Sequence, residues 1–128
     1  MTDKLRFQNR IALITGAGSE SGIGFAAART LAKGGAMVAL TSTTDRIHKR
    51  ANAIEAESPG VKGYIADLMD RDQAKNLLDR VIGDFGRIDI LVNNAGMVQV
   101  GKKETFVKYS LPLLPSDSRT PVRVNFAA

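Results

Sequence analysis

Short apolar runs alternate with amphipathic helical patterns along most of this chain. Four apolar runs predict buried strands, at residues 10–15, 36–41, 61–66 and 88–93. Between them, periodic patterns predict helices over residues 22–33, 45–57 and about 71–83. Strands that alternate with helices in this way are typical of βαβ units around a buried parallel sheet. We therefore predict an α/β fold of the doubly wound, Rossmann type, with strand order 3-2-1-4.

Local signals mark the ends of the predicted helices. Gly34-Gly35 follows the first helical pattern, where a glycine commonly ends a helix. Thr43 or Thr44 offers a hydroxyl as N-cap for the second helix. Asp70 precedes the third helix, and Gln73 three residues later completes a capping-box pattern.

The regular pattern fades after Gly96. We predict an irregular loop over residues 97–117. The sequence of residues 116–128 indicates the start of a helix, with Pro121 in or near its first turn. Asn125 is then expected on a helix. Because no further strand is predicted, we expect the sheet to stop after about four strands, so that residues 1–128 form one domain that is incomplete at its C-terminus.

Composition narrows the class of protein. Hydrophobic residues make up 44% and charged residues 24%, which is ordinary for a soluble globular domain. No apolar run approaches the length of a membrane span, and the first residues do not resemble a signal peptide, so we expect a cytoplasmic protein. With no cysteine and a single histidine, His48, we expect neither disulfides nor a metal site.

The net charge of +5 raises the question of nucleic-acid binding. The basic residues, however, are scattered among acidic ones, and no aromatic residues interleave with a basic run. Solvent-exposed charged residues explain most of the net positive charge, and the binding of anionic dinucleotide phosphates explains some of it. We therefore expect no nucleic-acid partner.

The segment Thr15-Gly-Ala-Gly-Ser-Glu-Ser-Gly-Ile-Gly24 joins the first strand to the first helix. A strand that passes through a glycine-rich turn into a helix is the geometry that binds a dinucleotide pyrophosphate, because the helix N-terminus offers unpaired N–H groups. The strict G-x-G-x-x-G motif is not present, because Ser21 stands where its third glycine belongs. A Walker A loop is excluded as well, because no Gly-Lys-Ser/Thr follows. A glycine-rich connection without a ligand is the alternative interpretation.

Together with Asn93-Asn94-Ala95-Gly96 after the fourth strand, this turn resembles the short-chain dehydrogenase/reductase family over residues 8–97. That family reads Thr-Gly-x-x-x-Gly-x-Gly after its first strand, whereas two extra residues precede Gly22-Ile23-Gly24 here. Either Ser19 or Ser21 is then the serine that meets the phosphate. The cofactor contacts that the resemblance implies are Gly16, Ser19, Ser21, Gly22, Ile23, Gly24, Asn94, Ala95 and Gly96, with Asn93 bracing neighbouring strands.

The end of the second strand predicts which cofactor binds. An acid there would hydrogen-bond the adenosine ribose and repel a 2′-phosphate, but this chain has Ser42-Thr43-Thr44 followed by Arg46. Hydroxyl groups beside a guanidinium favour NADP(H), with NAD(H) as the alternative. Thr43 or Thr44 can also cap the helix. By resemblance, Asp67 and the Leu68 backbone contact the adenine, although Asp67 can instead cap its own loop.

The catalytic residues of the family are a serine and a Tyr-x-x-x-Lys pair. Leucines stand four residues after both Tyr64 and Tyr109, so neither tyrosine begins such a pair. Asn125 resembles the asparagine that holds the catalytic lysine through water. The chain thus looks like the cofactor-binding half of a reductase similar to the 3-oxoacyl-(acyl-carrier-protein) reductases, which implies a small carbonyl or alcohol substrate and a homo-oligomer. A non-catalytic dinucleotide-binding module is the alternative.

Overall fold

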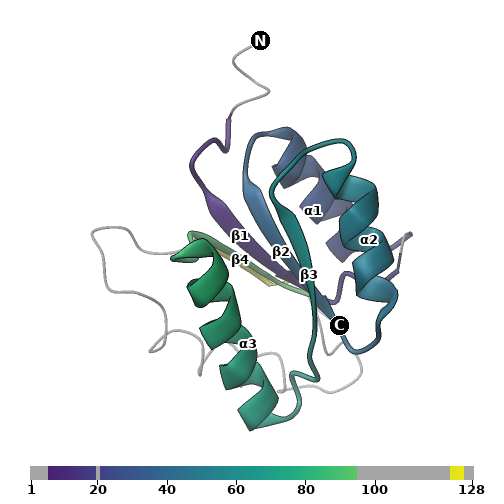
Figure 1. The fold of residues 1–128 in the computed structure, drawn as a ribbon, viewed down its shortest axis with the longest axis vertical. Coiled ribbons are helices and arrows are strands. Elements are labelled where there is room, and N and C mark those ends of the chain that lie inside the picture. The colour runs from purple at the N-terminus through teal and green to yellow at the C-terminus, as the bar shows by residue number, and fades with distance from the viewer. Residues whose placement is uncertain (1–5, 20, 95–121, 126–128) are drawn as a thin grey trace.

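The computed structural model describes residues 6–19 and 21–94, and the backbone of residues 122–125. These residues form one parallel sheet of order β3-β2-β1-β4-β5, with helices on both faces (Figure 1). The strands are β1 (Ile11–Thr15), β2 (Met37–Ser42), β3 (Val61–Ile65), β4 (Ile90–Asn93) and β5 (Val122–Asn125). The helices are α1 (Ile23–Lys33), α2 (Arg46–Glu55) and α3 (Arg71–Phe85).

The predicted α/β class and the strand order 3-2-1-4 are confirmed. The C-terminal part differs, because β5 pairs in parallel with β4 and places Asn125 opposite Asn93. The prediction that Asn125 lies on a helix, and that the sheet has no strand after β4, is therefore wrong. Val122 and Val124 are β-branched and favour a strand, and the edge of β4 offers them backbone hydrogen bonds.

Two hydrophobic cores lie on opposite faces of the sheet. Helices α1 and α2 cover one face, and α3 covers the other (Figure 1). Adjacent residues of β1 point to opposite faces, so that Ile14 packs in the first core and Leu13 in the second. All five residues of β1 are buried, as expected for a strand with neighbours on both sides and helices on both faces.

The helix ends follow the sequence signals in two cases of three. Gly35 has a positive φ of 98° and its N–H donates to the Ala32 carbonyl, which ends α1 as predicted. The Asp70 carboxylate accepts hydrogen bonds from the first turn of α3, also as predicted. The prediction that a threonine caps α2 is wrong. The N-cap residue is Asp45, and its side chain makes no capping hydrogen bond. The hydroxyl of Thr44 instead accepts a hydrogen bond from Arg46 at 3.2 Å.

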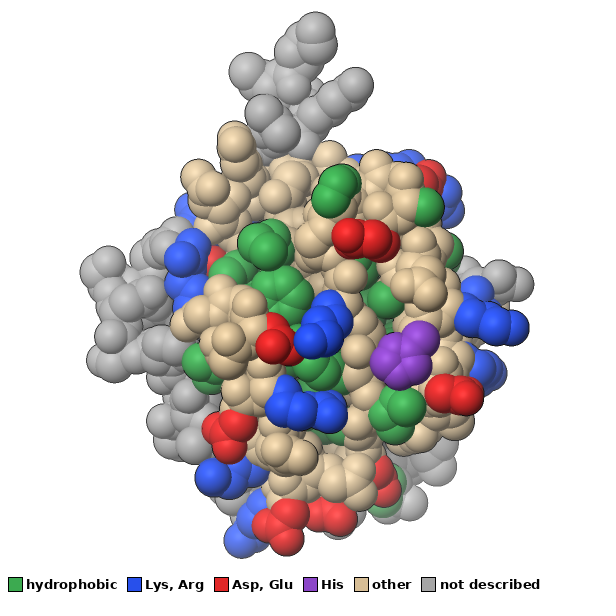
Figure 2. All heavy atoms as spheres, viewed as in Figure 1, with side chains coloured by type: hydrophobic (Ala, Val, Ile, Leu, Met, Phe, Trp, Pro, Cys, Tyr) green, Lys and Arg blue, Asp and Glu red, His purple; other side chains and the backbone are tan. Residues whose placement is uncertain are grey.

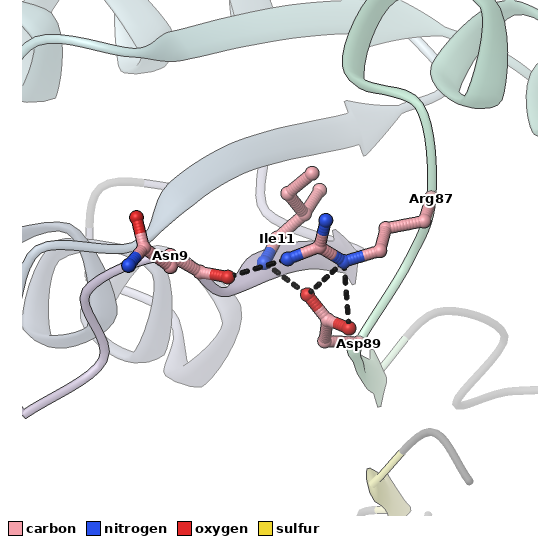
Figure 3. A network of polar contacts seen from close by, with 4 residues as sticks. All are labelled: Asn9, Ile11, Arg87 and Asp89. Atoms are coloured by element: carbon pink, nitrogen blue, oxygen red, sulfur yellow. Dashed lines mark hydrogen bonds and ion pairs between the residues drawn. The ribbon is translucent and has the colours of Figure 1, made fainter. Parts of the chain in front are cut away.

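A buried carboxylate joins the beginnings of β1 and β4 (Figure 3). Asp89 Oδ2 accepts from the backbone N–H of Ile11 at 2.9 Å, and the Asp89 N–H donates to the Ile11 carbonyl at 2.8 Å. Arg87 Nε lies 3.0 Å from the same carboxylate, and its Nη2 donates to the Asn9 carbonyl at 2.6 Å. These contacts fix where β4 begins to pair with β1.

We predict that Asp89→Ala lowers the free energy of unfolding by about 1–3 kcal/mol, because it leaves the buried Ile11 N–H without its acceptor. Asp89→Asn should cost less, since the amide oxygen can still accept that hydrogen bond. Urea denaturation of the two variants and the wild type measures both effects. Equal stability of Asp89→Ala and the wild type would contradict this role of the carboxylate.

Candidate dinucleotide-binding site

The candidate residues gather where the parallel strands end. Thr15 at the end of β1 lies beside Thr41 of β2, and Thr41 lies beside Tyr64 of β3. The segments that follow β1, β2, β3 and β4 therefore leave the sheet at one edge. In open α/β sheets, ligands bind in the crevice outside this edge, at the point where the strand order reverses. Here the order reverses between β1 and β4.

The glycine-rich loop turns sharply and packs closely against its surroundings. Gly16 has a positive φ of 69°, and the N–H of Ala17 donates to the Thr41 carbonyl at 3.0 Å. A Cβ on Gly24 would lie 2.8 Å from the Gly16 carbonyl oxygen and 3.0 Å from Asn94 Nδ2. Helix α1 can therefore begin this close to the loop only with glycine at position 24.

The start of α1 suits an anion. Its N-cap is Gly22, which provides no side-chain cap, and its first turn has no acidic residue. Ser19 and Ser21 lie just before it with hydroxyl oxygens 3.2 Å apart, so both remain alternatives for a phosphate contact. Ile23, the first residue of α1, is 57% exposed.

Buried hydrogen bonds connect the loop to the end of β4. The Thr15 hydroxyl lies 3.3 Å from Asn93 Oδ1 and accepts a hydrogen bond from the Asn94 N–H at 2.8 Å. The Asn94 side chain donates to the Gly16 carbonyl at 3.3 Å. The predicted bracing of neighbouring strands by Asn93 is confirmed, and Asn94 holds the glycine turn against β4.

A second polar group lies at the end of β2. The Ser42 hydroxyl donates to the Thr44 carbonyl at 3.0 Å, and a Cβ on Gly18 would lie only 3.0 Å from the Ser42 Cβ. Arg46 Nη2 would lie 3.8 Å from that same Cβ position, while Thr43 is exposed. The structure thus brings Ser42 and Arg46, two of the predicted selectivity residues, together beside the loop.

Sequence reasoning missed one residue of this group. Arg50 of α2 donates from Nε to the Gly18 carbonyl at 3.2 Å. Its position four residues after Arg46 places both arginines on the same side of the helix, which is the signal that was available.

Asp67 and Leu68 follow β3 and belong to a tight turn. Asp67 Oδ1 accepts from the Met69 N–H at 3.0 Å, and the Asp67 N–H donates to Gln73 Oε1 at 2.9 Å. The loop-capping role of Asp67 is therefore present, and the adenine contact stays a prediction. Ala95, Gly96, the loop 97–117 and the side chain of Asn125 lie outside the described residues.

A separate hollow of about 580 Å³ lies along β3, on the face of the molecule in Figure 2. Asp84 pairs there with Lys62 at 2.8 Å and accepts from the Tyr64 hydroxyl at 2.6 Å. Burial, reinforced by the Asp84 carboxylate, raises the pKa of Tyr64 well above its usual range. The Tyr64 hydroxyl of β3 thus donates its proton to a hydrogen bond with Asp84 of α3.

Across residues 6–19 and 21–94, no group of three or more His, Cys, Asp or Glu side chains could hold a metal ion. None of the helices described is both long enough and apolar enough to span a bilayer.

Comparisons with known proteins agree with this geometry. The sequence model described as short chain dehydrogenase matches residues 10–114. The 3-oxoacyl-[acyl-carrier-protein] reductase of Haemophilus influenzae is 43% identical over 93 residues, which are 72% of this chain and 36% of the relative. The chain thus spans little more than a third of that curated relative.

Solved structures are also similar to this chain. A short chain dehydrogenase from Burkholderia cenocepacia, solved in complex with NADP, is 41% identical with a TM-score of 0.66, over 75% of this chain and 39% of that one. A short chain dehydrogenase/reductase from Burkholderia phymatum, in complex with NAD, has a TM-score of 0.83 over 94% of this chain and 49% of that one. At 24% identity, the second similarity shows the fold alone.

Two neighbouring threonines allow a matched test of the hydrogen bonds at this edge. Thr15 and Thr41 are partners in adjacent strands, and both are buried. The Thr15 hydroxyl accepts the Asn94 N–H, whereas the Thr41 hydroxyl has no hydrogen-bond partner in the part of the chain that the structure describes. We predict that Thr15→Val destabilises the fold by about 1–3 kcal/mol, while Thr41→Val is neutral or stabilising.

Thermal and urea unfolding of the two variants measure this difference. Thr15→Ser, which loses the methyl group and keeps the hydroxyl, is the complementary control, because it should keep the hydrogen bond to Asn94. Equal destabilisation by both valine substitutions would show that the Thr15 hydroxyl does not hold the strand ends together.

Proposed function

Because the chain belongs to the short-chain dehydrogenase family, we propose that the strand ends and the glycine-rich loop bind a nicotinamide dinucleotide, NADP(H) in preference to NAD(H). The observation that carries this proposal is the close approach of α1 to the loop at Gly24, together with a helix N-terminus that has no side-chain cap. Unpaired N–H groups and the helix dipole favour a pyrophosphate at this position.

The other candidate residues are assigned around that pyrophosphate. Gly16, Gly22, Ile23 and Gly24 form the turn, with Ser19 or Ser21 on a phosphate oxygen. Asn94, Ala95 and Gly96 line the ribose, and Asp67 with the Leu68 backbone contacts the adenine. The position of Asn94 supports this assignment, because its amide lies beside both Gly16 and the start of α1.

Selectivity for the 2′-phosphate is assigned to Ser42, Thr43 and Arg46. Arg46 is an exposed cation whose guanidinium lies close to Gly18 and therefore beside the loop. A guanidinium and neighbouring hydroxyls can form charge-assisted hydrogen bonds to a phosphate. No carboxylate occupies residues 42–44, so nothing in that stretch would repel the extra charge of NADP(H).

The reaction assigned to the whole protein is hydride transfer between NADP(H) and a small carbonyl or alcohol substrate, as in 3-oxoacyl-(acyl-carrier-protein) reductases. The bound nicotinamide would supply or accept the hydride, while the residues of this chain bind and orient the cofactor. The alternative, a non-catalytic dinucleotide-binding module, is favoured by the absence of a Tyr-x-x-x-Lys sequence after Tyr64 or Tyr109. A cytoplasmic location and a homo-oligomer stay predictions.

We predict that the chain binds NADPH more tightly than NADH in calorimetric titrations. Arg46→Gln should weaken NADPH binding about tenfold or more, through loss of a charge-assisted hydrogen bond, and leave NADH binding within about twofold. Thr43→Asp should reverse the preference, because a carboxylate would face the 2′-phosphate. Lys49→Gln, which removes an exposed cation from the same helix, is the control. Tighter binding of NADH by the wild type would overturn the assigned selectivity.

We also predict that this chain alone reduces no carbonyl substrate at a rate typical of a reductase. General-acid catalysis contributes typically about 10²–10⁴-fold, and the chain has no Tyr-x-x-x-Lys pair to provide it. Oxidation of NADPH, followed by its absorbance in the presence of acetoacetyl thioesters, quinones and simple ketones, tests this expectation. Robust turnover would reveal a catalytic group other than those considered above.

A further inference from the structure

The loop from Gly16 to Gly22 is two residues longer than the Thr-Gly-x-x-x-Gly-x-Gly spacing. A longer loop has more conformations to lose when it binds a ligand, because each residue that becomes ordered loses backbone entropy. Contacts that order the loop before the cofactor arrives would therefore increase affinity.

Besides the hydrogen bond from Asn94 to the Gly16 carbonyl and the one between the Ser19 and Ser21 hydroxyls, three hydrogen bonds hold the described part of the loop. The Ala17 N–H donates to β2, and the Gly22 N–H donates to the Ser19 carbonyl within a local turn. Between them, the Gly18 carbonyl accepts from Arg50 Nε at 3.2 Å. This third bond comes from a side chain 32 positions away, on a helix that is packed against the sheet.

The hydrogen bond from Arg50 also fixes the orientation of the backbone N–H of Ser19. Every described peptide bond is trans, so the Gly18 carbonyl and the Ser19 N–H point in opposite directions from one peptide plane. When Arg50 holds the carbonyl towards α2, the Ser19 N–H is directed to the other side of the loop. Backbone N–H groups in glycine-rich loops are the donors that bind phosphates.

Arg46 and Arg50 differ in their surroundings although both are on α2. Arg46 is exposed, whereas Arg50 is partly buried and bonds the loop backbone. We propose that Arg50 is a positioning residue that holds the lengthened glycine loop in its pyrophosphate-binding conformation, and that it does not select between NADP(H) and NAD(H). This inference rests on the proposed function, since it assumes that the loop binds the pyrophosphate that both cofactors share.

The experiment compares Arg50→Met with Arg46→Gln in the full chain, with three ligands: NADPH, NADH and 2′-AMP, which has the 2′-phosphate but no pyrophosphate. Arg50→Met should raise the Kd of NADPH and of NADH by the same factor, about five- to tenfold, and leave the Kd of 2′-AMP within about twofold. Arg46→Gln should weaken the binding of NADPH and of 2′-AMP and leave the binding of NADH unchanged. If Arg50 has a purely structural role, Arg50→Met should lower the melting temperature and leave the Kd values of NADPH and NADH unchanged.

Arg50→Lys separates charge from geometry, because it keeps the charge and lacks the guanidinium Nε. Arg50→Lys should weaken the binding of both dinucleotides as Arg50→Met does. If Arg50→Met does not fold, the Kd values of Arg50→Lys for NADPH and NADH, each relative to the wild type, test the proposal. Loss of NADPH and 2′-AMP binding without loss of NADH binding would make Arg50 a ligand of the 2′-phosphate and overturn the proposal. Unchanged Kd values for both dinucleotides would overturn it as well.

Failure of the proposed function has a different signature. A wild-type chain that binds neither dinucleotide would overturn both the function and the role of Arg50. A wild-type chain that binds both, with unchanged affinity in the Arg50 variants, would overturn the role of Arg50 alone.

Discussion

The pairing of β1 with β4 is the contact on which the candidate site depends. The two strands are almost eighty positions apart in the sequence, and α1, β2, α2, β3 and α3 lie between them. Asp89 secures the beginning of the pair, and the Thr15 hydroxyl secures its end against Asn93 and Asn94. Closing so long a segment costs entropy, which polar contacts and the apolar cores on both faces must offset together.

Once those strand ends are held together, the glycine loop has little freedom. Asn94 holds the Gly16 carbonyl, β2 holds the Ala17 N–H, and the absence of a side chain at Gly24 lets α1 begin against the turn. The result is a helix N-terminus whose N-cap, Gly22, provides no side-chain cap and whose first turn has no acidic residue. This preorganisation favours binding, because an ordered loop loses less entropy when a phosphate arrives.

The sequence predicted those features that depend on local chemistry. Alternating apolar runs and helical patterns placed the strands β1 to β4 and the three helices, and Gly35 and Asp70 mark helix ends through their own backbone and side-chain preferences. Such signals are contained within a few residues of the feature that they specify. The expectation that the glycine turn and Asn94 contact one cofactor came instead from the family resemblance.

Features that depend on distant partners were not predicted. The segment with Asn125 pairs with the edge of β4 and does not start a helix. Arg50 was missed because its acceptor is a backbone carbonyl, which carries no residue-specific signal in the sequence. In each case the outcome depends on a competing contact that only the folded chain provides.

Amide hydrogen exchange of the chain, with and without saturating NADP⁺, tests the central claim most directly. The account predicts slower exchange in the described parts of the glycine loop and the first turn of α1, at residues 42–46, and at Asn94. Exchange along β3 and α3 beside the Tyr64–Asp84 hollow should change little. Protection confined to that hollow, or unchanged exchange in the glycine loop, would contradict the assignment of the dinucleotide site.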